Sequence, residues 1–218
     1  MYFVFQSAFM YSNKENLEAL HDIRKIMNQS SRFIGLSGLS GIAAGICALF
    51  GAIVAHYEIE RYWSDYVEGH PEKLRCTMLL VAVGTLIAAL LSAWFFTYRK
   101  TMSKDGKIWS SNMKRLLLSL FIPLFAAGIF LLKMVYLGYD QIIAPGCLVF
   151  YGLALMNASK YTFKEVGNLG MCEIALGLIC LFIPGYGLYF WTIGFGLLHI
   201  IYGGIMWNKY DKINETEQ

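Results

Sequence analysis

Charged residues are scarce in this 218-residue chain, since Asp, Glu, Lys and Arg together make up only 15% of it. Soluble domains carry about 25% charged residues. Hydrophobic residues make up 57% of the chain, and its mean hydropathy is +0.50. A soluble fold of this size would have to expose large apolar patches. The composition therefore excludes an ordinary soluble domain and indicates a chain that faces lipid.

The motifs of familiar enzymes and metal sites are also absent. The sequence contains no HExxH, no GxSxG, no P-loop and no Asp-rich motif for divalent metals. The five cysteines have neither CxxC nor zinc-site spacing. Inside an apolar segment a thiol behaves as a small apolar residue. We therefore expect no cofactor, no metal site and no catalytic residues of a known class.

Long apolar runs account for the composition. A bilayer core about 30 Å thick requires about 20 apolar residues per helix. Continuous runs favour helices, because the strands of a membrane barrel alternate polar and apolar residues. Six runs meet this description: 33–56, 77–97, 116–137, 142–159, 169–184 and 187–207. We predict an all-α polytopic membrane bundle of six transmembrane helices, in which the fourth and fifth are the shortest.

The basic residues predict the orientation of this bundle. Lys and Arg near the apolar runs divide 14 to 4 in favour of the side that holds both termini. Because positive charge stays on the cytoplasmic side, both termini are expected there. The basic loop at 98–115 fits proximity to anionic lipid, so we expect no nucleic-acid partner.

The predicted bundle, residues 32–208, follows an N-terminal cytoplasmic segment, 1–31, and precedes a cytoplasmic tail, 209–218. In the N-terminal segment, Ser12 and Glu15 have the spacing of a helix capping box. Apolar residues then recur at helical spacing: Leu17, Leu20, Ile23 and Met27. This pattern predicts an amphipathic helix. We expect it to dock on the bundle or to self-associate.

The first apolar run opens with a face of small residues, Ser37, Gly41 and Gly45, spaced four apart. Helices in lipid associate by close packing, which small residues at this spacing permit. The pattern favours packing within one subunit. The alternative is a homo-oligomer formed through the first span.

Three two-helix hairpins recur along the chain, and the last is the clearest. It has a Gly-dotted helix and a Pro-Gly turn in 170–185, then a second Gly-dotted helix in 191–204. This pattern resembles the short repeat of HdeD-like bacterial membrane proteins, which implies a link to acid resistance. The whole chain is also similar to a family of uncharacterised bacterial membrane proteins. The segments that carry this similarity run from Asn16 through residues 31–52 to residues 151–155. That second resemblance implies the inner membrane of a bacterium as the location, but it implies no activity.

Two ionisable residues, Glu173 and His199, lie within the fifth and sixth runs. Such groups are costly to bury in a membrane and are candidates for function. At 1.5 Å per residue they lie about 18 and 21 Å from the turn at Gly185, so antiparallel helices would hold them at similar depth. We predict a buried polar pair. Separate groups satisfied by the backbone, or a proton or ligand site, stay open, but two ligands are too few for zinc.

These observations lead to three hypotheses for function. The first is a non-enzymatic membrane protein that acts by association, in stress or envelope homeostasis. The second is a small proton-coupled transporter or channel that uses Glu173 and His199, and it requires a polar cavity containing both. The third is a membrane enzyme on a lipophilic substrate, and it requires three polar groups that converge at one depth. The lipid bilayer is the expected partner, and the sequence identifies no small-molecule ligand.

Overall fold

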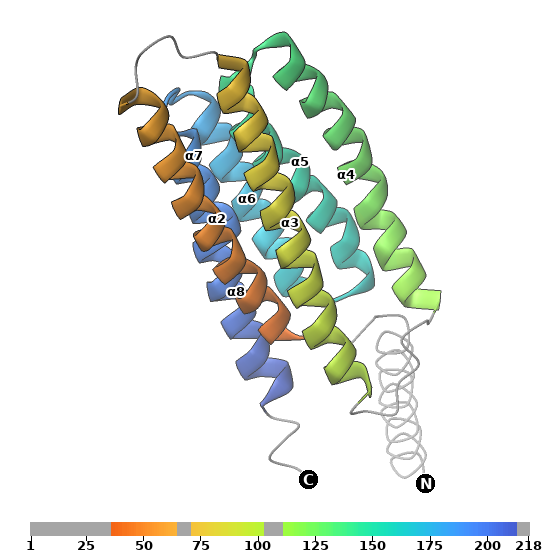
Figure 1. Cartoon of the computed structure of the whole chain (residues 1–218). Helices are drawn as coiled ribbons and strands as arrows, with labels where there is room; N and C mark the ends of the chain where they lie inside the picture. Colours follow the sequence, from red (N-terminus) through yellow and green to blue (C-terminus); the bar gives the residue numbers. More distant parts are fainter. Residues whose placement is uncertain (1–35, 65–70, 103–110, 213–218) are drawn as a thin grey trace, which may run out of the picture.

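The chain is helical almost throughout the parts that the computed structural model describes, residues 36–64, 71–102 and 111–212 (Figure 1). No β-strand occurs within these ranges. The all-α prediction is therefore confirmed for them. The predicted amphipathic helix in 1–31 and most of the tail lie outside the described residues.

Six helical rods follow one another in the described part of the chain. The first five are α2 (Gly38–Ser64), α3 (Pro71–Met102), α4 (Ser111–Leu137), α5 (Ile143–Ala158) and α6 (Lys164–Leu181). The last rod consists of α7 (Gly187–Trp191), the π-helical η3 (Thr192–Leu198), α8 (His199–Met206) and the π-helical η4 (Trp207–Asp211). Short 3-10 turns, η1 (Asp140–Ile142) and η2 (Ser159–Tyr161), flank α5. Each rod overlaps one of the six predicted runs, although α2 ends beyond its run and α3 extends past both ends of its run.

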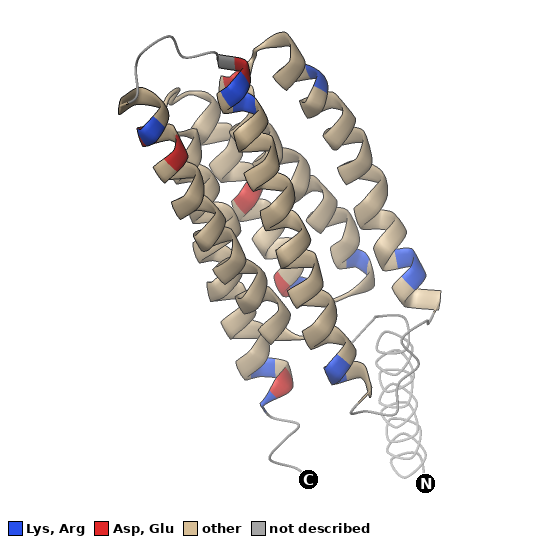
Figure 2. Cartoon of the chain, viewed as in Figure 1, with Lys and Arg blue, Asp and Glu red and all other residues tan. Residues whose placement is uncertain are grey.

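Five of the rods in these ranges are long and apolar enough to cross a membrane, when judged by length and composition alone. The exception is α6, whose 18 residues include Lys164, Glu165 and Glu173. Large apolar side chains cover the outside of the bundle, and Phe50, at 65% exposed, is an example. Lys, Arg, Asp and Glu lie mostly near the two ends of the rods (Figure 2).

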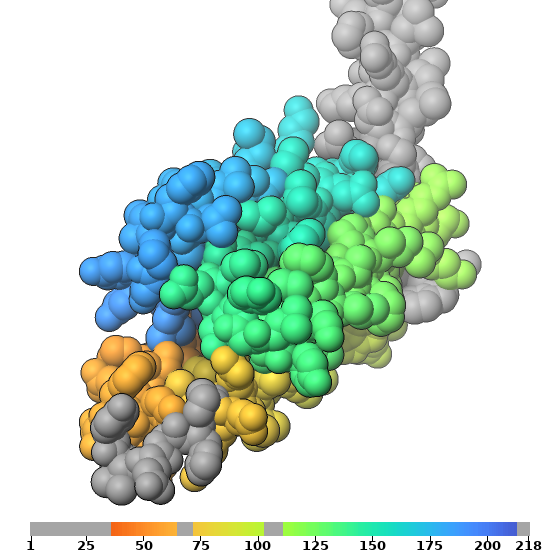
Figure 3. All heavy atoms as spheres, turned by 90° about the horizontal axis from the view of Figure 1, so that it is seen from above, coloured from red at the N-terminus to blue at the C-terminus, as the bar shows by residue number. Residues whose placement is uncertain are grey.

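The rods lie side by side and are inclined in the same direction (Figure 1). α5 packs against both α4 and α6, whereas α2 packs against α3 and against the last rod. Viewed from above, α2 and α3 lie at one edge of the bundle (Figure 3). Within the described residues, α3 makes extensive contact with α2 alone. The last rod contacts α2 more extensively than α6, its neighbour in the third predicted hairpin.

Glycines allow the backbones of α2 and the last rod to touch. A Cβ atom added at Gly45 would lie 2.7 Å from the carbonyl oxygen of Gly196, and one at Gly41 would lie 3.2 Å from the Cα of Gly203. The hydroxyl of Ser37 donates a hydrogen bond to Asp211 at 3.1 Å. The small-residue face of the first run is thus covered by the last rod of the same chain. A homo-oligomer through the first span stays a prediction.

A polar network holds together the end of the bundle where α2 begins. Asp211, at the end of the last rod, accepts a hydrogen bond from the backbone N–H of Gly38 at 3.0 Å. The Nζ of Lys100, near the end of α3, lies 2.6 Å from the other carboxylate oxygen of Asp211 and donates to the carbonyl of Leu36 at 2.6 Å. One carboxylate therefore joins α2, α3 and the last rod.

Replacing Gly45 by Leu should force α2 away from the last rod. We expect the free energy of unfolding to fall by about 1–3 kcal/mol, the usual cost of overpacking. Gly84→Leu is the matched control, because a Cβ atom there has no neighbour within 4 Å. Unfolding in detergent measures both variants. Equal stability of the two would contradict the close approach of α2 to the last rod.

Candidate functional site

A cavity of about 560 Å³ lies within the bundle, and residues from both α3 and α4 line it. Leu86 and Leu90 belong to the α3 wall, and Leu120 and Leu124 belong to the α4 wall. Among the described helices, α3 makes extensive contact with α2 alone, so α3 and α4 both line the cavity without packing extensively against each other. Its remaining walls come from α2, α5, α6 and the last rod.

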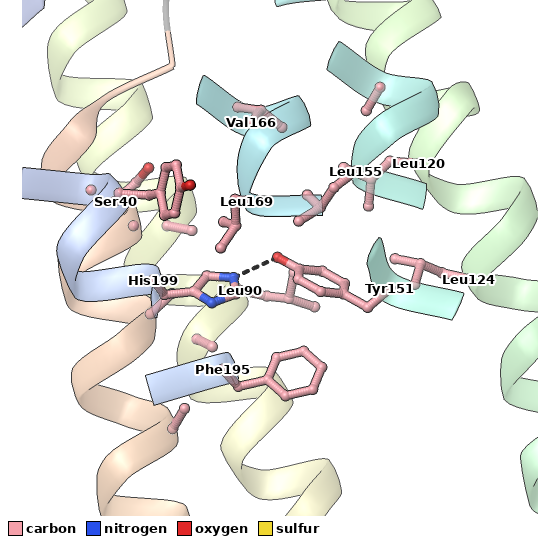
Figure 4. A pocket seen from close by; sticks show the side chains of 18 of the residues that line it. Ser40, Leu90, Leu120, Leu124, Tyr151, Leu155, Val166, Leu169, Phe195 and His199 are labelled. Carbon is pink, nitrogen blue, oxygen red and sulfur yellow. Dashed lines mark hydrogen bonds between the residues drawn. The ribbon is translucent and has the colours of Figure 1, made fainter. Parts of the chain in front are cut away.

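Two polar side chains meet on the wall of this cavity. Tyr151 comes from the middle of α5 and His199 begins α8. The Tyr151 hydroxyl lies 2.8 Å from Nε2 of His199 (Figure 4). The ring of Phe195 lies beside both, with its centroid 4.9 Å from that of Tyr151. This part of the cavity therefore combines mainly apolar walls with a hydrogen-bonded polar pair.

The other nitrogen of His199 is held by the backbone. Nδ1 lies 3.0 Å from the carbonyl oxygen of Gly194. A carbonyl can only accept, so Nδ1 carries a hydrogen and donates it. Gly194 belongs to the π-helical segment η3, a rare conformation that often occurs at functional sites. The orientation of the His199 ring is thus set from within its own rod.

Glu173 lies behind His199 and does not line the cavity. Its side chain is 0% exposed, and one carboxyl oxygen lies 3.5 Å from Nδ1 of His199. Neither oxygen has a hydrogen-bond partner among the described residues. Gly194 provides the space for this carboxyl, since a Cβ atom there would lie 2.5 Å from Oε2. The structure brings together the two residues that the sequence singled out.

Burial limits the protonation of this pair. An isolated carboxylate removed from water is far costlier than a neutral acid or a paired ion. Glu173 and His199 must therefore hold two protons between them, one of them on Nδ1 of His199. The second proton is on Glu173 or on Nε2 of His199. Because Nδ1–H is directed to the carbonyl of Gly194, an ionised Glu173 would have no hydrogen bond. The neutral pair is the cheaper arrangement.

The sequence alone points neither to Tyr151 as a site residue nor to the cavity. A tyrosine within an apolar run has no charge that would mark it, and its partner is 48 residues away in the chain. The available signal was weak: Tyr151 is a hydrogen-bonding group near the middle of a predicted span. The polar side chains of this site come from three rods, and only the packing of these rods brings them together.

A second polar group borders the cavity at the end where α2 begins. It contains Ser37, Ser40, Thr162 and Glu165. Glu165 accepts hydrogen bonds from Lys209 at 2.6 Å and from Tyr210 at 3.0 Å. This carboxylate is therefore paired with a cation and hydrogen-bonded, unlike that of Glu173.

Comparisons with protein-family models, with curated proteins and with solved structures found no match to this chain. In the described ranges, no group of three or more His, Cys, Asp or Glu side chains could hold a metal ion. The function must therefore be argued from the cavity and from the polar groups on its wall.

Replacing Glu173 by Met should stabilise the protein. The change removes an unsatisfied buried carboxyl, and we expect a gain of about 1–3 kcal/mol in the free energy of unfolding. Glu165→Met is the matched control, because it removes a buried carboxyl of the same helix that has partners, and it should destabilise. Thermal unfolding in detergent compares them. A loss of stability in Glu173→Met would mean that Glu173 is satisfied after all.

Proposed function

We propose that the chain is a multi-pass protein of the bacterial inner membrane whose six rods all cross the bilayer, with both termini in the cytoplasm. The apolar outer surface and the concentration of charge at the ends of the rods support this. The 14 to 4 distribution of Lys and Arg supports the orientation. At 1.5 Å per residue, α6 is about 27 Å long, which is close to the thickness of the bilayer core.

Cys76 offers a test of this orientation. It is exposed near the start of α3, which the proposal places on the outer side of the membrane. A membrane-impermeant maleimide should label the chain in intact spheroplasts, and Cys76→Ser should abolish the labelling. Labelling that appears only after the membrane is permeabilised would reverse the orientation.

We further propose that the protein binds a lipophilic molecule, which enters from the bilayer between α3 and α4. The observation that carries this is the cavity of about 560 Å³, with apolar walls and the Tyr151–His199 pair on one side. Ligand sites are typically apolar cavities of about 300–1,000 Å³ with a few placed polar groups. An opening between two lipid-facing helices suits a ligand that is dissolved in the bilayer.

The other hypotheses have less support. Association through the first span would use a face that the last rod already covers. A proton-coupled transporter calls for a polar cavity that contains Glu173 and His199, but these walls are mainly apolar and Glu173 lies behind His199. A membrane enzyme on a lipophilic substrate stays the second candidate, because Tyr151, His199 and Glu173 converge. Such an enzyme would need the same binding step.

Filling the cavity should block binding. Ala89 lines the cavity on α3, whereas its neighbour Ala88 is exposed and does not line it. The probe is 9,10-dibromo-octadecan-1-ol in detergent, whose bromines quench Trp191, a residue of the cavity wall. The cavity signal is the quenching that Trp191→Phe removes. We expect it to saturate in the wild type and in Ala88→Phe and to be at least tenfold weaker in Ala89→Phe.

Equal quenching in the two Phe variants would show that the probe reaches Trp191 from outside the cavity. That result would overturn the proposed binding function. Turnover of bound lipophilic alcohols or esters, abolished by Tyr151→Phe, would instead favour the enzyme.

A further inference from the structure

We propose that the polar pair selects ligands that donate a hydrogen bond, so that the ligand is a lipophilic alcohol whose hydroxyl donates to Tyr151. This inference rests on the proposed binding function and adds the chemical class of the ligand. It follows from the hydrogen bonds that Tyr151, His199 and Ser40 already donate within the protein.

The chain of hydrogen bonds starts at Gly194. Its carbonyl oxygen can only accept, so the hydrogen on Nδ1 of His199 is committed to it. In a neutral imidazole the other nitrogen then has no hydrogen and accepts. The contact of 2.8 Å between Nε2 and the Tyr151 hydroxyl is therefore a bond that the hydroxyl donates.

The neutral imidazole follows from the surroundings of Glu173. A positive His199 would require an ionised Glu173 to balance it in this buried place. That carboxylate would have no hydrogen-bond partner among the described residues, because Nδ1–H is directed to Gly194. His199 and Glu173 are the two ionisable groups at this position, and Tyr151 is the polar group that faces them from α5. Both members of the buried pair are therefore neutral.

With its hydrogen directed to His199, Tyr151 presents only oxygen lone pairs to the cavity. The labelled side chains around it are apolar: Leu120, Leu124, Leu155 and Phe195 (Figure 4). Ser40, a further hydroxyl of the cavity wall, is arranged in the same way, because it donates to the carbonyl of Ser37 at 2.5 Å. Both hydroxyls accept from a ligand and do not donate to it.

This arrangement distinguishes classes of lipophilic molecule. An alcohol can donate to Tyr151 and leave the bond to His199 intact. An ether, ketone or ester offers only acceptors, which would face the lone pairs of Tyr151. An ammonium group can donate, but its charge would be costly to bury among the apolar side chains around Tyr151. The alcohol is therefore the class that fits.

The test compares two probes that differ only in the donor, 9,10-dibromo-octadecan-1-ol and its methyl ether. The readout is the cavity signal from Trp191, measured on the full chain in detergent. We expect the alcohol to bind roughly 3- to 10-fold more tightly than the ether, which is the net worth of one hydrogen bond. Tyr151→Phe should bind both probes equally, at the level of the ether in the wild type.

A second variant acts in the opposite direction. His199→Leu removes the acceptor and frees the hydrogen of Tyr151, so the ether should gain affinity and the preference for alcohol should vanish. Unfolding temperature checks that both variants are folded, and either one alone decides the question. A preference for alcohol that persists in the folded variants would overturn the inference.

The outcomes separate the two proposals. If the wild type binds both probes equally, or prefers the ether, the selectivity is wrong while the binding function stands. If neither probe gives a cavity signal that Ala89→Phe reduces, the binding function fails and the selectivity fails with it.

Discussion

The contact between the backbones of α2 and the last rod is the constraint on which the rest of the structure depends. It exists because Gly41, Gly45, Gly196 and Gly203 have no side chains to hold the two helices apart. Close approach of this kind is how helices associate where lipid removes the hydrophobic drive between them. It fixes the depth and rotation of the last rod, and so brings His199 to Tyr151 on α5 and to Glu173 on α6.

The site that results is costly to stability. The Glu173 carboxyl is 0% exposed and has no hydrogen-bond partner among the described residues. Burying it lowers the free energy of unfolding relative to an apolar side chain at the same place. Gly194 adds to this destabilisation, because the carboxyl occupies the space that a side chain at this position of the π-helical segment would fill. Costs of this kind usually mark a site that is kept for function.

α3 has a different relation to the bundle. It packs along α2, and its most apolar stretch is not buried inside the chain. At one end, Lys100 ties it to Asp211 and Leu36. A helix held along one side and at one end has few buried contacts that oppose its motion. Under the proposed binding function, α3 and α4 are the helices between which a molecule from the bilayer would enter.

The sequence by itself determined the helical class of the described residues and roughly where each rod lies, because long apolar runs without alternation favour helices over strands. It also placed Glu173 and His199 at similar depth, since helical rise converts residue number into distance. Tertiary structure alone decided which helices touch. The rotation of each rod, set by glycine contacts far apart in the chain, determined that the small face of α2 meets the last rod. The same rotation brought Tyr151 to His199 and left a cavity beside α3.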